Sequence, residues 1–197
     1  MGVVNGYRTA MSKLKTNDLI DKLNTVVVNT KSTYSSQRNY KGLSNGLVAL
    51  VGILPRDMYE GNGETWNSNM PVTNSFSGNF VIESAAANDN EFGAFILAVD
   101  SIPSSVCFKL VTANWSSESD SDLQAIYVNS AEGNNVYDAI DSDQIKPSII
   151  QPTSVSDQGG TGSSNASYVN VGGLISPQDA VSICGESSKV TIAWKFI

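Results

Sequence analysis

Residues 3–34 read VVNGYRTAMSKLKTNDLIDKLNTVVVNTKSTY, a run that contains no proline. Polar residues alternate with apolar ones at a helical spacing, so this run predicts one long amphipathic helix. When the residues are placed about 100° apart around the helix axis, the apolar ones form two groups roughly half a turn from each other. The first group is Val3, Val4, Tyr7, Ala10, Met11 and Leu14, and the second is Leu19, Ile20, Leu23, Val26, Val27 and Tyr34.

The apolar side changes near residues 15–18, and two interpretations fit this change. One is a break into two short helices, and the other is a single helix with two different partners. No glycine or proline interrupts residues 15–18, which favours the continuous helix. In that case we expect residues 19–34 to pack on the chain's own domain, and residues 3–14 to project beyond it and pack on another molecule.

The rest of the chain predicts strands and short helices, and therefore an α+β fold. The nearly continuous apolar run 92–99 predicts a strand buried on both faces, which we expect at the centre of the sheet. In the last predicted strand Val190, Ile192, Trp194 and Phe196 share one face. The other predicted elements are a short apolar segment at 43–54, strands at 79–84, 123–128 and 189–196, helices at 103–113 and 176–184, and mostly loop at 138–173.

Length and composition indicate one extracytoplasmic domain. A chain of 197 residues suits a single core, which we divide into a helix at 1–40 and a head at 41–197. Charged residues make up only 16% of the chain and Ser, Thr, Asn and Gly are abundant, as in secreted or cell-surface bacterial proteins. The net charge of -7 argues against direct binding to nucleic acid or to anionic lipid.

The residues that catalysis and metal binding usually need are scarce. The chain has no histidine, which excludes Ser-His-Asp and Cys-His catalysis and every zinc site that uses histidine. Its two cysteines, Cys107 and Cys184, favour one disulfide in an exported protein, with two buried free thiols as the alternative. We expect no catalytic residues, no cofactor and no enzymatic activity.

One acidic segment has a spacing that suits calcium. Glu118, Asp120 and Asp122 alternate with serines, but the segment lacks the glycine and the distal glutamate of an EF-hand loop. A solvated acidic loop is the favoured interpretation, and a calcium site is the weaker alternative.

Three parts of the chain resemble a known family. They are residues 2–4 and 22–40 of the helix, residues 91–95 (EFGAF) with 102–107 (IPSSVC), and residues 175–184 (ISPQDAVSIC). These parts resemble the type IVb pilins of Gram-negative bacteria, the class of toxin-coregulated, bundle-forming, longus-like and conjugative thin pili. The resemblance implies a long N-terminal helix packed on an antiparallel sheet, with the C-terminal region tied by a disulfide between Cys107 and Cys184.

The resemblance also implies a function. Members of this family are structural subunits that polymerise with copies of themselves into an extracellular cell-surface filament. The filament serves adhesion, bacterial aggregation or conjugative contact, so its partners are host or bacterial cell surfaces. Family members lie in the inner membrane before assembly, are cleaved and N-methylated by a prepilin peptidase, and are assembled by dedicated pilus machinery. The group from Val3 to Leu14 then corresponds to the lower part of the filament-core helix.

Two further expectations follow from the resemblance. The family's leader and the apolar first half of its helix are absent here, so we expect them to be encoded upstream of Met1; the protein then contacts the membrane only through this missing part. The alternatives are a minor pilin or a type II secretion pseudopilin. A secreted ligand-binding domain or hydrolase is less favoured, because no pair of carboxylates can be assigned to one cleft.

Overall fold

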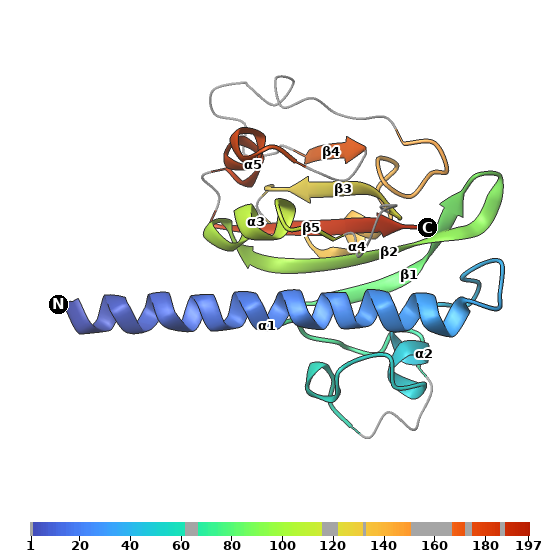
Figure 1. Ribbon diagram of the computed structural model, residues 1–197, viewed down its shortest axis with the longest axis horizontal. Coiled ribbons are helices and arrows are strands. Elements are labelled where there is room, and N and C mark those ends of the chain that lie inside the picture. Colours follow the sequence, from blue (N-terminus) through green and yellow to red (C-terminus); the bar gives the residue numbers. More distant parts are fainter. Residues whose placement is uncertain are drawn as a thin grey trace.

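A long helix and a five-stranded sheet organise the chain (Figure 1). The computed structural model describes residues 2–61, 67–115, 122–131, 133–150, 167–171, 175–185 and 188–197. The predicted fold class, a helix packed on an antiparallel sheet, is confirmed. In chain order the elements are α1 (Gly2–Tyr34), α2 (Asn45–Leu50), a 3-10 helix (Arg56–Met58), β1 (Phe80–Ala87), β2 (Asn90–Pro103), α3 (Ser104–Val111), β3 (Leu123–Asn129), α4 (Val136–Ile140), β4 (Ser167–Val171), α5 (Pro177–Cys184) and β5 (Lys189–Phe196).

The strand order is β1-β2-β5-β3-β4, and all neighbouring strands are antiparallel. The last strand of the chain therefore enters between β2 and β3 and takes the centre. The expectation that residues 92–99 form the central strand is wrong, because β2 lies one place away from it. Burial on both faces is common to β2 and β5, so burial alone does not distinguish a central strand from its neighbour.

Helices α1, α3 and α5 cover one face of the sheet and enclose the larger core. The predicted apolar face of β5 (Val190, Ile192, Trp194 and Phe196) points into this core. Aromatic rings meet there: Phe95 stacks on Phe196 with ring centroids 5.3 Å apart, and Trp115 lies 5.0 Å from Trp194. Such contacts add to the hydrophobic burial of the rings.

Helix α4 and the segment after it cover the opposite face. Six small alanine side chains of the strands allow this close approach, and Val136, Ile140 and Ile145 pack on them. The prediction that residues 138–173 are mostly loop missed β4 and the end of α4, and residues 151–166 and 172–174 of this stretch fall outside the described part. The reason is that β4 has only five residues and forms by pairing with β3, and no local sequence pattern predicts this pairing. The alanines are Ala85, Ala87, Ala94, Ala98, Ala125 and Ala193.

One lysine is buried beneath this cover. Lys195 of β5 is fully buried, and its Nζ donates to the carbonyls of residues 145, 146 and 147 at 3.1, 3.3 and 2.6 Å. Burial lowers the pKa of Lys195 to about 8. The three carbonyls satisfy the ammonium's donors, so this side chain fastens the segment after α4 onto the sheet.

A side-chain amide pairs with the edge of β1 that faces away from β2. The Ile82 N–H donates to Asn45 Oδ1 at 2.9 Å, and Asn45 Nδ2 donates to the Phe80 carbonyl at 2.9 Å. The amide thereby takes the place of a neighbouring strand and satisfies backbone groups that an edge strand leaves open. Ser44 caps α2 and so places Asn45 at the first turn of that helix.

Candidate assembly surface on helix α1

Helix α1 is continuous through residues 15–18, as the single-helix interpretation expects. Its packed side begins at Thr16, whose hydroxyl donates to the Ser12 carbonyl one turn earlier. Leu19 and Leu23 are completely buried, and Ile20 is half-buried against the same core. The remaining buried residues of this side are Val26, Val27, Thr30 and Tyr34. At about 25 cal/mol per Å² of apolar surface, this side contributes much of what holds the helix on the head.

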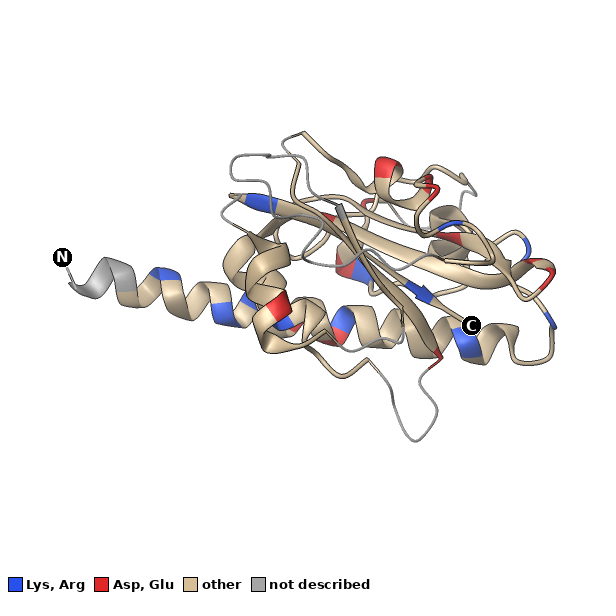
Figure 2. Cartoon of the chain, turned by 90° about the horizontal axis from the view of Figure 1, so that it is seen from above, with Lys and Arg blue, Asp and Glu red and all other residues tan. Residues whose placement is uncertain are grey.

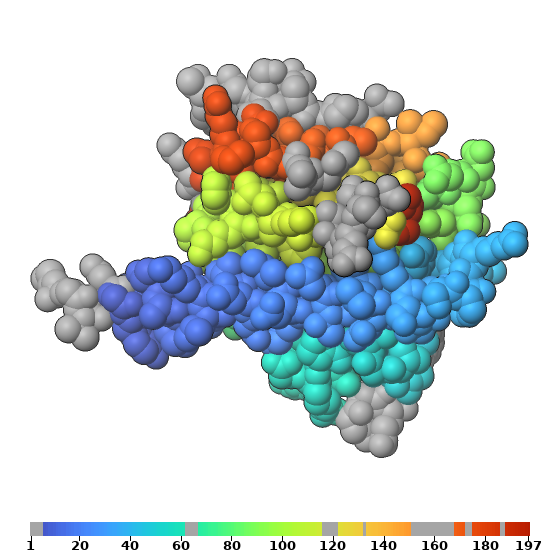
Figure 3. All heavy atoms as spheres, viewed as in Figure 1, coloured from blue at the N-terminus to red at the C-terminus, as the bar shows by residue number. Residues whose placement is uncertain are grey.

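The N-terminal part of α1 is exposed. Tyr7 is 67% exposed and Leu14 is 63% exposed, although both are large apolar side chains. Ala10 and Met11 are exposed on the same side of the helix. Val3 and Val4 lie in α1, but their side chains fall outside the described residues. In Figure 3 this end of the helix extends past the head, and the rest of α1 runs along the molecular surface.

The exposed side of the projecting part continues along the outer side of the packed part. Tyr7, Leu14, Asp21 and Val28 follow one another at seven-residue intervals, so they form a nearly straight line on the helix. Val28 is 55% exposed. We call these four residues the outer line of α1. Its first half is apolar and its second half contains the exposed carboxylate of Asp21, so the two halves differ in polarity.

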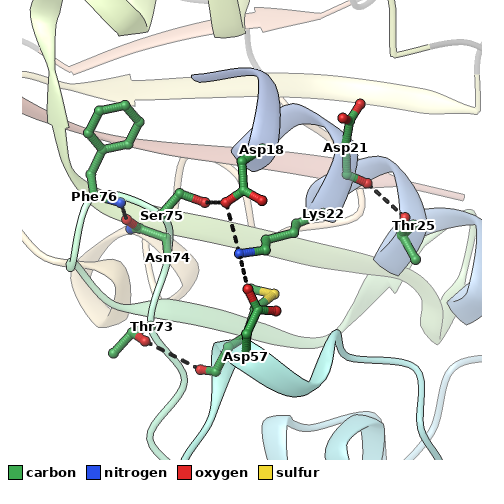
Figure 4. A network of polar contacts seen from close by, with 10 residues as sticks. Asp18, Asp21, Lys22, Thr25, Asp57, Thr73, Asn74, Ser75 and Phe76 are labelled. Carbon is green, nitrogen blue, oxygen red and sulfur yellow. Dashed lines mark hydrogen bonds and ion pairs between the residues drawn. The ribbon is translucent and has the colours of Figure 1, made fainter. Parts of the chain in front are cut away.

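A polar network holds α1 to the head where the projecting part begins (Figure 4). Lys22 Nζ lies 2.8 Å from an Asp18 carboxylate oxygen and 2.6 Å from one of Asp57. The Ser75 hydroxyl donates to Asp18 at 2.6 Å. A second cation, Lys15, lies 6.0 Å from the centre of the Phe76 ring. The helix is therefore linked to two loops that are remote from it in sequence.

The charges of this network stabilise one another. Partial burial alone would raise the pKa of Asp18, but hydrogen bonds from Lys22 and Ser75 lower it. Burial likewise opposes the charged form of Lys22, yet hydrogen bonds to Asp18 and Asp57 raise its pKa. Each group therefore stays ionised near neutral pH. Because Asp18 and Asp57 are half-exposed or more, the network orients α1 more than it stabilises the fold.

The disulfide between Cys107 and Cys184 is present, and the alternative of free thiols is wrong. It joins α3 to α5 with a Cα–Cα distance of 5.7 Å, on the face of the sheet that α1 also covers. Both sulfur-bearing side chains are buried. The bond therefore ties the C-terminal region to the segment that follows β2.

The predicted acidic segment lies only partly within the described residues. Asp122 forms an ion pair with Lys31 of α1 at 2.5 Å, whereas Glu118 and Asp120 fall outside the described part. The calcium alternative stays a prediction. Across the described ranges no group of three or more Cys, Asp or Glu residues is arranged to hold a metal ion. No helix within these ranges is long and apolar enough to cross a membrane.

Sequence reasoning did not find the network around Lys22. Asp57 lies in the short 3-10 helix and Ser75 in a turn, each more than 30 residues from its partner on α1. No periodicity connects such positions, because the contact exists only after the loops fold against the helix. One signal was present: Lys22 follows Asp18 at the i,i+4 spacing, which favours an ion pair on a helix.

A long N-terminal helix laid on an antiparallel sheet, with a disulfide closing the C-terminal region, is the pilin fold. The model of the PilS N-terminal family matches residues 13–148, well over half of the chain. The chain belongs to this family and is a type IVb pilin. The family and the fold are those of structural subunits of pili.

Two solved structures share this fold. TcpA, a type IV pilin from Vibrio cholerae El Tor biotype, matches with a TM-score of 0.56 and 16% identity over 93% of this chain and 99% of its own. A type IVb pilin from Salmonella typhi matches with a TM-score of 0.52 and 14% identity over 90% of this chain and 96% of its own. A search of curated proteins found no match.

Proposed function

We propose that this chain is the major subunit of a type IVb pilus and that it polymerises through α1 into an extracellular filament. The observation that carries the proposal is the exposed apolar side of the projecting part of α1, with Tyr7 and Leu14 each more than 60% exposed. Apolar surface of this kind is a usual sign of a protein interface. A helix that packs on a different surface of the next copy makes a heterologous contact, and such contacts propagate into helical filaments.

The head of each subunit remains outside this helical contact. It presents the exposed residues of α4 and of α5, such as Tyr137 and Val181, to the surroundings. In the proposed filament these surfaces meet a host or bacterial cell surface, in adhesion, bacterial aggregation or conjugative contact. The subunit enters the filament from the inner membrane, after processing by a prepilin peptidase and with the help of the pilus assembly machinery.

The test compares two substitutions of exposed apolar residues in the native bacterium. Leu14→Ser removes an apolar side chain from the projecting part of α1, and Val181→Ser is the matched control on α5, where the valine is 66% exposed. We expect Leu14→Ser to reduce filament number strongly in electron micrographs, while the level of folded subunit stays normal. Val181→Ser should leave filament number unchanged.

Deleting the gene separates the major subunit from its alternatives. A deletion strain should carry none of these filaments. If it carries them in normal number and appearance, the chain is not the major subunit. Fewer filaments that are otherwise normal would instead indicate a minor pilin that primes assembly. Normal assembly of the Leu14→Ser subunit would show that the contact does not use α1.

A further inference from the structure

The charges of the chain are divided unevenly between the projecting part of α1 and the rest. Residues 1–15 contain three cations, Arg8, Lys13 and Lys15, and no acidic residue. The rest of the chain has nine Lys and Arg residues against all nineteen Asp and Glu residues. Figure 2 shows this division, because outside its grey end the projecting part carries only blue residues. The net charge of -7 therefore conceals a basic helix attached to an acidic head.

The described part of the projecting helix is amphipathic. Tyr7, Met11 and Leu14 share one side, and they are 67%, 37% and 63% exposed. At about 100° per residue, Thr9 and Ser12 lie nearly opposite to them. The head packs on α1 further along this opposite side. The head therefore does not shield the apolar side of the projecting part.

The three cations lie at the two edges of this apolar side. At the same angular spacing, Arg8 and Lys15 lie about a quarter turn or slightly more from its centre in one direction, and Lys13 lies as far in the other. All three are exposed, and none of them forms an ion pair within the described residues. Long cationic side chains beside an apolar side can lay their stems on apolar surface and keep their charge in water. This pattern is typical of helices that bind the interface of an anionic membrane.

An anionic bilayer suits both features of this surface. A nucleic acid would attract the cations but would leave Tyr7 and Leu14 in water. A second copy at the same level would cover the apolar side but would bring cations beside cations, which repel. The boundary between headgroups and acyl chains takes up apolar side chains, and the lipid phosphates beside it attract Lys and Arg.

The acidic residues further along α1 limit how much of the helix can touch a bilayer. Asp18 and Asp21 lie on the same side as Leu14, about one and two turns further along. Lipid phosphates repel these carboxylates, so the contact ends before Asp18 and the helix is inclined, with the head raised from the surface. Residues 6–15 span about 15 Å, whereas the Debye length at physiological ionic strength is about 8 Å. Most of the negative charge of the head is therefore screened from the bilayer.

We infer that the projecting part of α1 binds the surface of an anionic phospholipid bilayer, with its apolar side at the acyl boundary and its three cations on lipid phosphates. Surface binding of this kind needs no membrane-spanning helix. It gives the surface used in the proposed filament a second partner, and it does not require a filament. Because one side of a helix cannot contact both partners, a subunit leaves the bilayer surface when it enters the filament. The net charge of the chain argued against anionic lipid, but the charge near a bilayer is that of residues 1–15.

The first test measures co-sedimentation of the whole chain with phospholipid vesicles. The chain should bind vesicles of phosphatidylcholine mixed with phosphatidylglycerol, and binding should weaken as salt is added. Vesicles of phosphatidylcholine alone should bind little. Equal binding to both kinds of vesicle, or no binding to the anionic ones, would overturn the inference. Self-association of the chain without vesicle binding would assign the apolar side to a second copy alone.

A matched pair of triple variants separates the projecting part from net charge. One variant replaces all three cations of residues 1–15 by glutamine. It should lower partitioning onto anionic vesicles by about a hundredfold, since each cation near such a surface contributes about fivefold. The control removes one arginine and two lysines that are exposed elsewhere, by Arg38→Gln, Lys109→Gln and Lys189→Gln. The control should bind almost normally, and equal losses in the two variants would overturn the inference.

A second test reads which side of the helix meets the lipid. Met11→Cys and Thr9→Cys are each labelled with an environment-sensitive fluorophore, which reacts only with the new thiol because Cys107 and Cys184 are joined. On anionic vesicles the emission of the label at position 11 should shift to shorter wavelength, and that of the label at position 9 should not. Equal shifts, or no shift at position 11, would overturn the orientation. These results leave the proposed filament untouched, because the deletion strain tests the filament without vesicles.

Discussion

Removing the disulfide tests how the C-terminal region is held. The perturbation is the double substitution Cys107→Ala and Cys184→Ala, which breaks the covalent link between α3 and α5. Both cysteines are buried in the larger core. Strand β5, the centre of the sheet, begins only a few residues after Cys184. The disulfide therefore restrains the segment that leads into β5, and β5 joins the two halves of the sheet.

The size of the effect follows from the length of chain that the bond closes. Cys107 and Cys184 are 77 residues apart, and the chain-entropy model gives about 4.5 kcal/mol for a loop of this length at 25 °C. Small domains are commonly stable by only about 5–15 kcal/mol. The double variant should therefore lose a large part of its free energy of unfolding. The replaced side chains leave only small cavities, so the loss comes mainly from the greater entropy of the unfolded chain.

Urea unfolding of the isolated subunit, followed by far-UV circular dichroism, measures this loss. We expect the midpoint of the double variant to fall by about 2 M or more if the slope is about 2 kcal/mol per M. Wild-type subunit reduced within the denaturant should unfold at the same midpoint as the variant, which serves as the control. A difference in the free energy of unfolding below about 1 kcal/mol would refute the reasoning, because the loop would then be restrained without the bond.

Further predictions concern other parts of the fold. Leu23→Ala should lower the free energy of unfolding by about 3–5 kcal/mol and Leu14→Ala by less than about 0.5 kcal/mol, measured by urea unfolding, since one leucine is buried and the other exposed. Equal losses would contradict the two-sided helix. Because burial lowers the pKa of Lys195 to about 8, the native state binds fewer protons than the unfolded state above that pH. The free energy of unfolding should therefore rise with pH. Measured as the difference from Lys195→Met, it should rise by about 2 kcal/mol between about pH 7 and pH 9.5, and a pH-independent difference would contradict this. Asn45→Ala should cost about 2–3 kcal/mol, because backbone groups of β1 lose their partner, and amide exchange at the edge of β1 should quicken. Gly46→Ala should reduce folded yield, since the added Cβ would collide with the Asn67 carbonyl; normal yield would contradict that close approach.

The helical periodicity of residues 3–34 predicted α1 and its two apolar sides. A helix maps residues onto faces by a constant rotation, so the separation of Leu14 from Leu19 around the axis follows from their positions in the sequence. The α+β class and most of the strands were predicted from apolar runs and from two-residue alternation. The pairing of Cys107 with Cys184 needed only the presence of two cysteines in an exported chain.

The positions of the strands in the sheet could not be predicted in this way. Residues 92–99 and residues 189–196 both have the composition of a buried strand, and nothing local indicates which of them lies at the centre. Strand β4 was missed because five residues between glycine-rich segments carry too weak a pattern. Strand order depends on which distant segments pair, and pairing is decided by the packing of the whole domain.

The sequence by itself determined that residues 3–34 carry two apolar groups on different sides of a helix and that residues 1–15 carry only basic charges, and it favoured a continuous helix, which the structure shows. Each of these is a property of residues close together in the chain. Only the tertiary structure decided that Asp57 and Ser75 meet α1 beside Lys22, that Lys195 is buried, and which face of the helix remains open. These depend on contacts between segments far apart in sequence, and such contacts are selected by the shared burial of apolar surface rather than by any local pattern.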